Sequence, residues 1–254
     1  SRTDYYFDEA WNRRCRENFQ RQHPEAVGKK IAVWAPTFRG NAAEPRLEGL
    51  EAVQQAAWNL KDDWYLIIKA HPHVDRHGMV SNSAIPTEEL LPVADVLITD
   101  YSSVLFDYLL YRKPAVLFAT DLEEYEQIRG FYIDYQSIPF PIVKTGAELE
   151  AELRILACQD MQEGERGSTG KSVVRRAALE CDSSIAPEGA AVEGDLSVVS
   201  EEAAEYKKGR HEVHWPAADW QEAHAQEIDA FRETYVGACD GRSTERILQL
   251  IGLD

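Results

Sequence analysis

The chain has 254 residues, 44% of them hydrophobic and 10% aromatic, so it can bury a substantial core and is not a disordered segment. Its 27 basic and 44 acidic side chains give a formal net charge of −17, which argues against nucleic acid and anionic lipid as partners of this segment. The 4 cysteines form no C-x-x-C pair, a spacing that favours a reduced compartment over a disulfide framework or a zinc site.

Short apolar runs alternate with helical patterns as far as residue 157. Strands that are apolar on both faces are typical of a parallel sheet covered by helices on both sides. The pattern therefore predicts an α/β fold with a doubly wound, Rossmann-like parallel sheet. The expected strands are 29–36, 64–72, 96–100 and 114–120. The expected helices are 9–22, 46–59, 86–94, 102–111 and 146–156.

Composition divides the chain into four stretches. Residues 1–28 form a lead-in segment before the Rossmann-like domain of residues 29–157. Residues 158–218 are rich in Gly, Ser, Ala and Glu, and we expect an insertion or flexible element of unknown role there. Residues 219–254 are expected to form C-terminal helices that pack back on the domain. These helices are expected at 219–235 and 243–251.

Polar side chains follow the ends of the expected strands. Right-handed crossovers bring the carboxyl ends of parallel strands to one edge of the sheet, and ligands bind at that edge. The sequence therefore predicts a site formed by these side chains. They are Thr37, Arg39, His71, Asp100, Ser102, Ser103 and Asp121.

Ser102 and Ser103 stand where a buried strand is followed by a helix. A helix start offers free backbone N–H groups and the positive end of the helix dipole, which bind phosphate without Lys or Arg. The alternative is that one of these serines is an ordinary helix cap. Their position beside other polar strand ends favours phosphate binding.

His71 follows the second expected strand in the sequence K-A-H-P. A histidine at this edge can donate to a diphosphate oxygen or act as a general acid or base, since its charge changes near neutral pH. The alternative is a structural histidine bound to a backbone carbonyl. With His73 and His77 it resembles no usual metal site, so we expect no metal and no cofactor.

Arg39 lies in the sequence W-A-P-T-F-R-G, after the first expected strand. Its guanidinium can bind a phosphate or an acceptor, and Gly40 permits close approach of the backbone. The alternative is a loop arginine in water.

The sequence D-G-R-S-T-E-R-I at 240–247 forms a turn followed by a helix start. Read as structure alone, this is a capped helix. Read as a site, Ser243, Thr244 and Arg246 return to the ligand cleft from the C-terminal end of the chain.

Taken together, these motifs resemble the CDP-glycerol glycerophosphotransferase family of teichoic acid primases and polymerases. They occur in the family's order within residues 1–157 and about 219–252. The segments that carry the resemblance are R-T-D-Y-Y-F (2–7), W-A-P-T-F-R-G (34–40), K-A-H-P (69–72), A-D-V-L-I-T-D-Y-S-S-V-L-F-D-Y (94–108), D-L-E-E-Y (121–125), R-G-F-Y (129–132), P-I-V-K-T (141–145), F-R-E-T-Y (231–235) and D-G-R-S-T-E-R-I (240–247).

The resemblance implies a GT-B transferase, of which this chain is the C-terminal, donor-binding half and residues 1–28 the lead-in from the other half. It implies CDP-glycerol as donor and attack by an acceptor hydroxyl on its β-phosphorus, with release of CMP. His71 is then the catalytic residue, and the diphosphate is bound by Ser102, Ser103 and the residues after the first strand, Arg39 and Thr37. The resemblance extends nucleotide or phosphate binding to Asp100, Asp121, Ser243, Thr244 and Arg246.

A second histidine motif of the family, H-G-x-P-x-K, is absent from this sequence, so we expect the segment alone to bind donor with weak turnover or none. The acceptor is expected to be a polyol phosphate or lipid-linked. Family members work at the inner face of the cytoplasmic membrane, and membrane contact is expected through parts outside this chain. The alternatives are a related transferase that uses CDP-ribitol or a UDP-sugar, and a nucleotide-binding module without chemistry.

Overall fold

A computed structural model describes residues 2–41, 44–72, 74, 80–159, 220–237, 239–242 and 246. The chain divides into two compact units, one of residues 1–158 with 219–254 and the other of residues 159–218. Apart from the end of one helix, the described residues belong to the first unit, which is the subject of all that follows.

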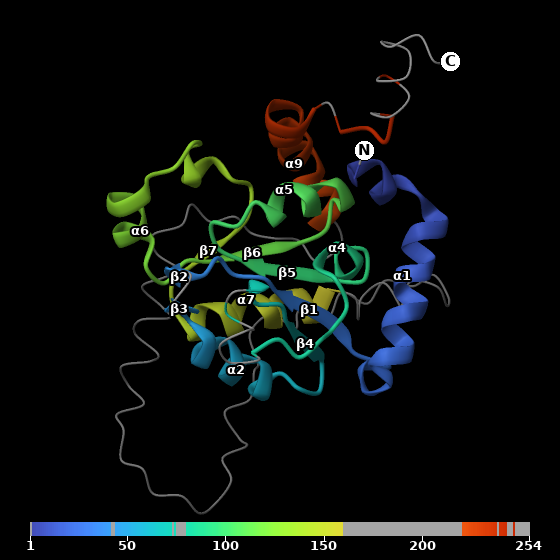
Figure 1. Cartoon of the computed structure of the whole chain (residues 1–254), viewed down its shortest axis with the longest axis horizontal. Coiled ribbons are helices and arrows are strands. Elements are labelled where there is room, and N and C mark those ends of the chain that lie inside the picture. The colour runs from blue at the N-terminus through green and yellow to red at the C-terminus, as the bar shows by residue number, and fades with distance from the viewer. Residues whose placement is uncertain are drawn as a thin grey trace, which may run out of the picture. The chain divides into compact units, whose positions relative to one another are not determined.

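A five-stranded, wholly parallel sheet forms the centre of this unit (Figure 1). The strands are β1 (Lys30–Trp34), β4 (Trp64–Ile68), β5 (Val96–Thr99), β6 (Ala115–Phe118) and β7 (Ile142–Val143). Their spatial order is β4-β1-β5-β6-β7, so the direction of winding reverses between β1 and β5. In doubly wound sheets this reversal opens a crevice at the carboxyl ends of the two strands, where ligands bind.

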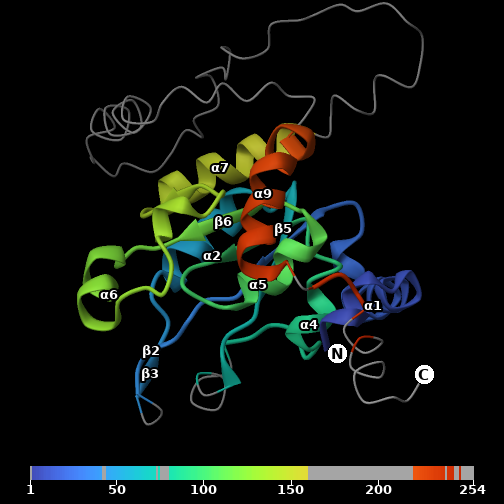
Figure 2. The same ribbon diagram turned by 90° about the horizontal axis from the view of Figure 1, so that it is seen from above.

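Helices cover both faces of the sheet (Figures 1 and 2). Successive residues of β1 point to opposite faces of the sheet, and both faces are apolar. Val33 packs in one hydrophobic cluster and Trp34 in the other. The first cluster includes side chains of α1 (Glu9–Gln22), α4 (Thr87–Leu90), α5 (Val104–Tyr108) and α9 (Trp220–Val236). The second includes side chains of α2 (Leu50–Asn59) and α7 (Gly146–Gln159). The predicted α/β, doubly wound parallel sheet is therefore confirmed.

Several predicted elements are shorter in the structure than in the sequence pattern. The strand expected at 64–72 ends at Ile68, because the amide of Ile68 donates to Asn82 Oδ1 (2.8 Å) and that of Ala70 to Ser81 Oγ (2.9 Å). Side chains there take the place of a neighbouring strand. The helix expected at 102–111 is divided into α5 and the 3₁₀ turn η3 (Leu109–Tyr111).

Other elements have no counterpart in the prediction. They are the hairpin of β2 (Arg39–Gly40) and β3 (Pro45–Arg46), the helix α6 (Leu122–Arg129), and the 3₁₀ turns η1 (Arg2–Phe7), η2 (Pro24–Ala26) and η4 (Tyr135–Ser137).

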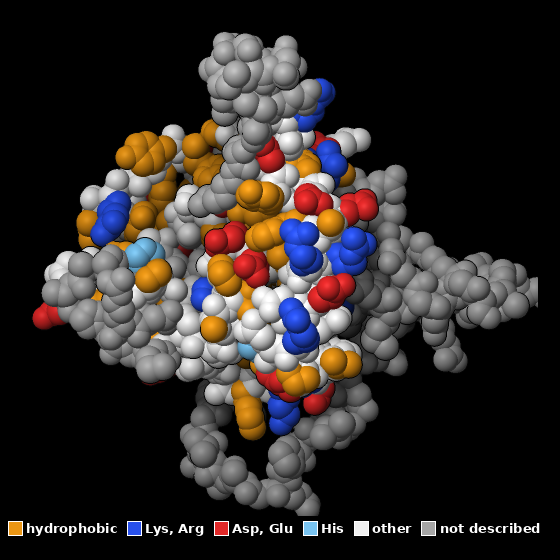
Figure 3. Space-filling model, turned by 45° about the vertical axis from the view of Figure 1, so that its right-hand side comes forward, with side chains coloured by type: hydrophobic (Ala, Val, Ile, Leu, Met, Phe, Trp, Pro, Cys, Tyr) orange, Lys and Arg blue, Asp and Glu red, His pale blue; other side chains and the backbone are white. Residues whose placement is uncertain are grey.

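The lead-in segment packs on the same core as the sheet. Tyr6, Cys15 and Phe19 are buried in the cluster that α5 and α9 cover. On the surface, basic and acidic side chains alternate over the face that α1 presents (Figure 3). The N-terminal 28 residues are thus part of this compact unit.

Helix α9 also packs on the core of this unit. Ile228 and Phe231 of α9 are buried in the first cluster, and Arg112 donates to both carboxylate oxygens of Asp229 at 2.8 and 3.1 Å. The helix expected at 243–251 lies outside the described residues except for Arg246, and the insertion expected at 158–218 lies outside them except for the end of α7. Within the described part of the chain, no helix is both long and apolar enough to cross a membrane.

Candidate functional site

A pocket of about 350 Å³ lies at the carboxyl edge of the sheet, beside the point where the strand order reverses. Its volume falls at the lower end of the range of about 300–1,000 Å³ that is usual for small-molecule sites. The lining residues come from the segments that follow β1, β4 and β5, and from η1, α4 and α5. They are Tyr6, Ala35, Pro36, Lys69, Ala70, His71, Pro72, Thr87, Glu88, Leu91, Ser102, Ser103, Val104 and Asp107.

Ser102 and Ser103 line this pocket between β5 and α5. Ser103 occupies the cap position of α5, and its side chain forms no capping hydrogen bond. Ser102 Oγ accepts a long hydrogen bond from the amide of Val104 (3.4 Å). The pair is therefore at the predicted edge and beside a cavity, and phosphate binding by it stays a prediction.

His71 lines the same pocket from the segment after β4. Its ring contacts that of Phe38, with centroids 4.8 Å apart, and its carbonyl accepts from the amide of Val74 at 2.8 Å. His73 and His77 lie outside the described residues. In the described ranges, His, Cys, Asp and Glu side chains form no group of three or more with the geometry of a metal site.

Five polar residues of the pocket were not assigned to the site by the sequence: Tyr6, Lys69, Thr87, Glu88 and Asp107. Lys69 was quoted only as the neighbour of His71, and Asp107 had no assigned role, although it stands one helical turn after Ser103 and so shares its face. Tyr6 and Glu88 come from η1 and α4, and no spacing rule relates them to the strand ends. Tyr6 is buried, and its hydroxyl donates to Asp107 Oδ2 at 3.5 Å.

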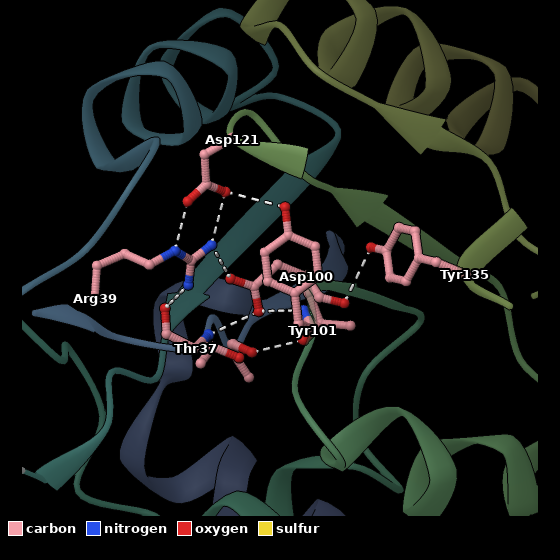
Figure 4. A network of polar contacts seen from close by, with 8 residues as sticks. Thr37, Arg39, Asp100, Tyr101, Asp121 and Tyr135 are labelled. Atoms are coloured by element: carbon pink, nitrogen blue, oxygen red, sulfur yellow. Dashed lines mark hydrogen bonds and ion pairs between the residues drawn. The ribbon is translucent and has the colours of Figure 1, made fainter. Parts of the chain in front are cut away.

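Arg39 lies outside this pocket, in a network of ion pairs beside it (Figure 4). Its Nε and Nη2 donate to the two carboxylate oxygens of Asp121 at 2.6 and 2.9 Å, and its Nη2 lies 3.1 Å from Asp100 Oδ2. Its Nη1 donates to the carbonyl of Thr37 at 2.7 Å. The planar guanidinium thus joins the segments that follow β1, β5 and β6.

Asp100 is the buried centre of this network. Its Oδ1 accepts the amides of Thr37 and Tyr101, both at 2.7 Å, so one carboxylate fixes the backbone after β1 and after β5. Burial raises the pKa of the Asp100 carboxyl, and the Arg39 guanidinium acts against that rise. At Asp121 the hydrogen bonds from Arg39 outweigh the effect of burial, so the pKa of its carboxyl is lowered.

Aromatic rings surround the Arg39 guanidinium. The rings of Tyr101 and Tyr125 stack with centroids 3.8 Å apart, and the guanidinium carbon lies 4.9 and 5.0 Å from them. The Tyr101 hydroxyl donates to Asp121 Oδ1 at 3.0 Å, and that of Tyr135 to the Asp100 carbonyl at 3.2 Å. The structure therefore places these polar strand-end residues in an internal network beside the pocket, and none of them is part of the pocket lining.

The described residues of the C-terminal motif lie near η1 at Gly241. Arg246 is exposed and donates to both carboxylate oxygens of Asp240 at 2.9 and 2.8 Å. Gly241, with φ of +83°, packs on Phe7, where a Cβ at this glycine would lie 3.0 Å from the phenylalanine side chain. Ser243 and Thr244 lie outside the described residues. The motif is thus close to the residue that follows Tyr6, but Arg246 is not part of the pocket lining.

Comparison with known families agrees with these features. The family described as CDP-glycerol:poly(glycerophosphate) glycerophosphotransferase matches residues 1–174, more than half of the chain. The chain belongs to this family. The resemblance inferred from the ordered motifs is therefore confirmed, and the match includes every segment that lines the pocket.

The curated relatives of this chain are named as enzymes of teichoic acid synthesis. A teichoic acid poly(ribitol-phosphate) polymerase of Bacillus spizizenii is 37% identical over 161 residues, which cover 58% of this chain and 26% of the relative. A teichoic acid glycerol-phosphate primase of Bacillus subtilis is 38% identical over 121 residues, which cover 43% of this chain and 31% of the relative. The chain spans less than a third of the length of these two relatives.

Solved structures of the wall teichoic acid polymerase TagF share the fold. One matches 99% of this chain and 50% of its own, with a TM-score of 0.59 and 22% identity. Another, of a variant soaked with CDPG, has a TM-score of 0.58 and also 22% identity. At this identity the likeness concerns the fold alone. A match to half of a TagF chain agrees with the fold expected for one half of a GT-B transferase.

Proposed function

We propose that this protein binds the donor of a transferase that moves polyol phosphate from a CDP-polyol to a hydroxyl of a teichoic-acid-type acceptor and releases CMP. The observation that carries the proposal is the pocket at the sheet edge, lined by Ser102, Ser103 and His71, in a member of the glycerophosphotransferase family. CDP-glycerol is the donor that the family's description favours.

The pocket supplies the groups that phosphoryl transfer requires. Phosphate oxygens accept hydrogen bonds from the Ser102 and Ser103 hydroxyls and nearby amides, and the Lys69 ammonium offsets their charge. The acceptor oxygen attacks the β-phosphorus in line, the bond from that phosphorus to the bridging oxygen breaks, and CMP leaves. His71 donates to a diphosphate oxygen or transfers the proton of the acceptor hydroxyl. Positioning and charge neutralisation provide most of the rate enhancement in such reactions.

For Thr37, Arg39, Asp100 and Asp121 we propose an indirect role in place of direct contact with the donor. Their hydrogen bonds are made to one another, to the Tyr101 hydroxyl and to backbone groups. They fix the segments after β1 and β5, and those two segments carry Pro36 and Ser102 into the pocket wall. A contact of Ser243, Thr244 and Arg246 with the donor remains a prediction.

A CDP-ribitol donor is the second candidate, and the 37% identity with a poly(ribitol-phosphate) polymerase is the observation that favours it. Transfer from a UDP-sugar and nucleotide binding without chemistry are weaker alternatives. The acceptor is proposed to be a polyol phosphate or lipid-linked, and the site of action to be the inner face of the cell membrane.

Isothermal titration calorimetry with CDP-glycerol, CDP-ribitol and UDP-glucose tests the proposal. We expect the protein to bind CDP-glycerol more tightly than UDP-glucose.

Alanine at both Ser102 and Ser103 is expected to cost about 1–3 kcal/mol of binding free energy, or about 5–150-fold in affinity, since hydrogen bonds to a charged group are lost. Ser137→Ala, at an exposed serine outside the pocket, is the control. Absence of binding by every cytidine ligand would refute the proposed function.

A further inference from the structure

The pocket has two chemically different sides. Its strand side consists of Lys69, His71 and Ser102, which follow β4 and β5. These groups are hydrogen-bond donors, and one of them is a cation. An anion such as a diphosphate is therefore accommodated on the strand side.

The helix side includes Tyr6 of η1, Thr87 and Glu88 of α4, and Asp107 of α5. The Tyr6 side chain is buried, and its hydroxyl faces the Asp107 carboxylate at 3.5 Å. Glu88 is exposed at the rim, so its carboxylate is hydrated until a ligand enters. Two carboxylates thus border a pocket that is proposed to bind an anionic donor.

Carboxylates do not bind phosphate, because like charges at close range repel and an ionised carboxylate is only an acceptor. They also form no three-ligand group for a metal ion with neighbouring residues of the described part of the chain. Hydroxyl groups suit these carboxylates, since O–H donors form short, charge-assisted hydrogen bonds to them. In a CDP-polyol the hydroxyl-rich group is attached directly to the β-phosphate.

We infer that Asp107, Glu88 and Tyr6 form a subsite for the hydroxyl groups of the donor's polyol, next to the diphosphate on the strand side. This inference rests on the proposed function and deepens it. The placement of Asp107 supports it, because Asp107 stands four residues after Ser103 on one face of α5, within reach of a group joined to a phosphate at Ser103. The subsite then contributes to selection of the polyol, while the strand side binds any nucleoside diphosphate.

Comparison of CDP with CDP-glycerol and CDP-ribitol tests the subsite, since CDP contains the ribose and the diphosphate but no polyol. The wild-type protein is expected to bind at least one CDP-polyol more tightly than CDP. In an Asp107→Asn, Glu88→Gln double variant this preference is expected to fall about tenfold or more, with affinity for CDP unchanged or higher. Glu89→Gln is the matched control, because Glu89 lies on the same helix outside the pocket and accepts from Asn18.

The outcomes separate the two proposals. If the wild-type protein binds neither CDP nor a CDP-polyol, the proposed function and the subsite both fail. If it binds CDP and the polyol adds nothing, or the double variant weakens CDP equally, only the subsite fails. A requirement for Mg²⁺ that the double variant removes would assign the carboxylates to a cation and also refute the subsite.

Tyr6→Phe removes one hydroxyl and is expected to reduce the preference for a CDP-polyol over CDP by a smaller factor. This variant keeps the test valid if the double variant does not fold.

Discussion

Replacing Arg39 with alanine is expected to lower the free energy of unfolding by about 3–5 kcal/mol, the usual cost of leaving a buried charge without its partner. The Arg39 side chain is 13% exposed, that of Asp121 16% and that of Asp100 4%, so the carboxylates that lose their partner are mostly shielded from water. For a chain of this size, such a loss corresponds to a fall of about 6–20 °C in Tm. Urea unfolding followed by circular dichroism measures it.

Arg112→Ala is the matched control for this prediction. Arg112 also donates to both oxygens of an aspartate, Asp229, but the two side chains are 57% and 36% exposed. An exposed ion pair contributes about 0–1 kcal/mol, so the unfolding midpoint of this variant is expected to change little. Equal shifts in the two variants would mean that the Arg39 network does not stabilise the ends of β1, β5 and β6.

Replacing His71 with alanine is expected to reduce turnover about 10²–10⁴-fold, the range for loss of a positioned acid or base. Because His71 is exposed, the thermal midpoint is expected to stay near that of the wild type. Release of CMP from CDP-glycerol in the presence of acceptor measures the turnover.

His71→Gln distinguishes proton transfer from donor binding. The glutamine amide retains a hydrogen-bond donor but cannot transfer a proton near neutral pH. We therefore expect the affinity for CDP-glycerol to recover in this variant, while turnover stays low. Turnover close to wild type in the glutamine variant would show that His71 only binds the donor, and wild-type turnover in the alanine variant would remove it from the mechanism.

Much of the fold was predictable because parallel strands buried on both faces leave a distinct signal. In β1, every residue after Lys30 is buried, with Val33 on one face and Trp34 on the other. The same argument predicted the edge of the sheet at which the pocket lies. Helix α1 begins and ends at the expected residues, since Asp8 accepts from the amide of Ala10 at its start.

The partners of the polar side chains were less predictable. Arg39 and Asp121 are 82 positions apart, and their pairing depends on the order of β1, β5 and β6 in space, which no local pattern specifies. Sequence alone favoured phosphate or acceptor binding by Arg39 over a loop arginine in water. Tyr6 contacts Asp107, which is 101 positions away in the sequence, so its place in the pocket could not be predicted from a local pattern either.

A crystal structure of the protein soaked with CDP-glycerol tests the central claim most directly. The account predicts the diphosphate at the start of α5, within hydrogen-bond distance of Ser102 and beside His71. A nucleotide bound at any other place, with water alone in the pocket at Ser102, would contradict it.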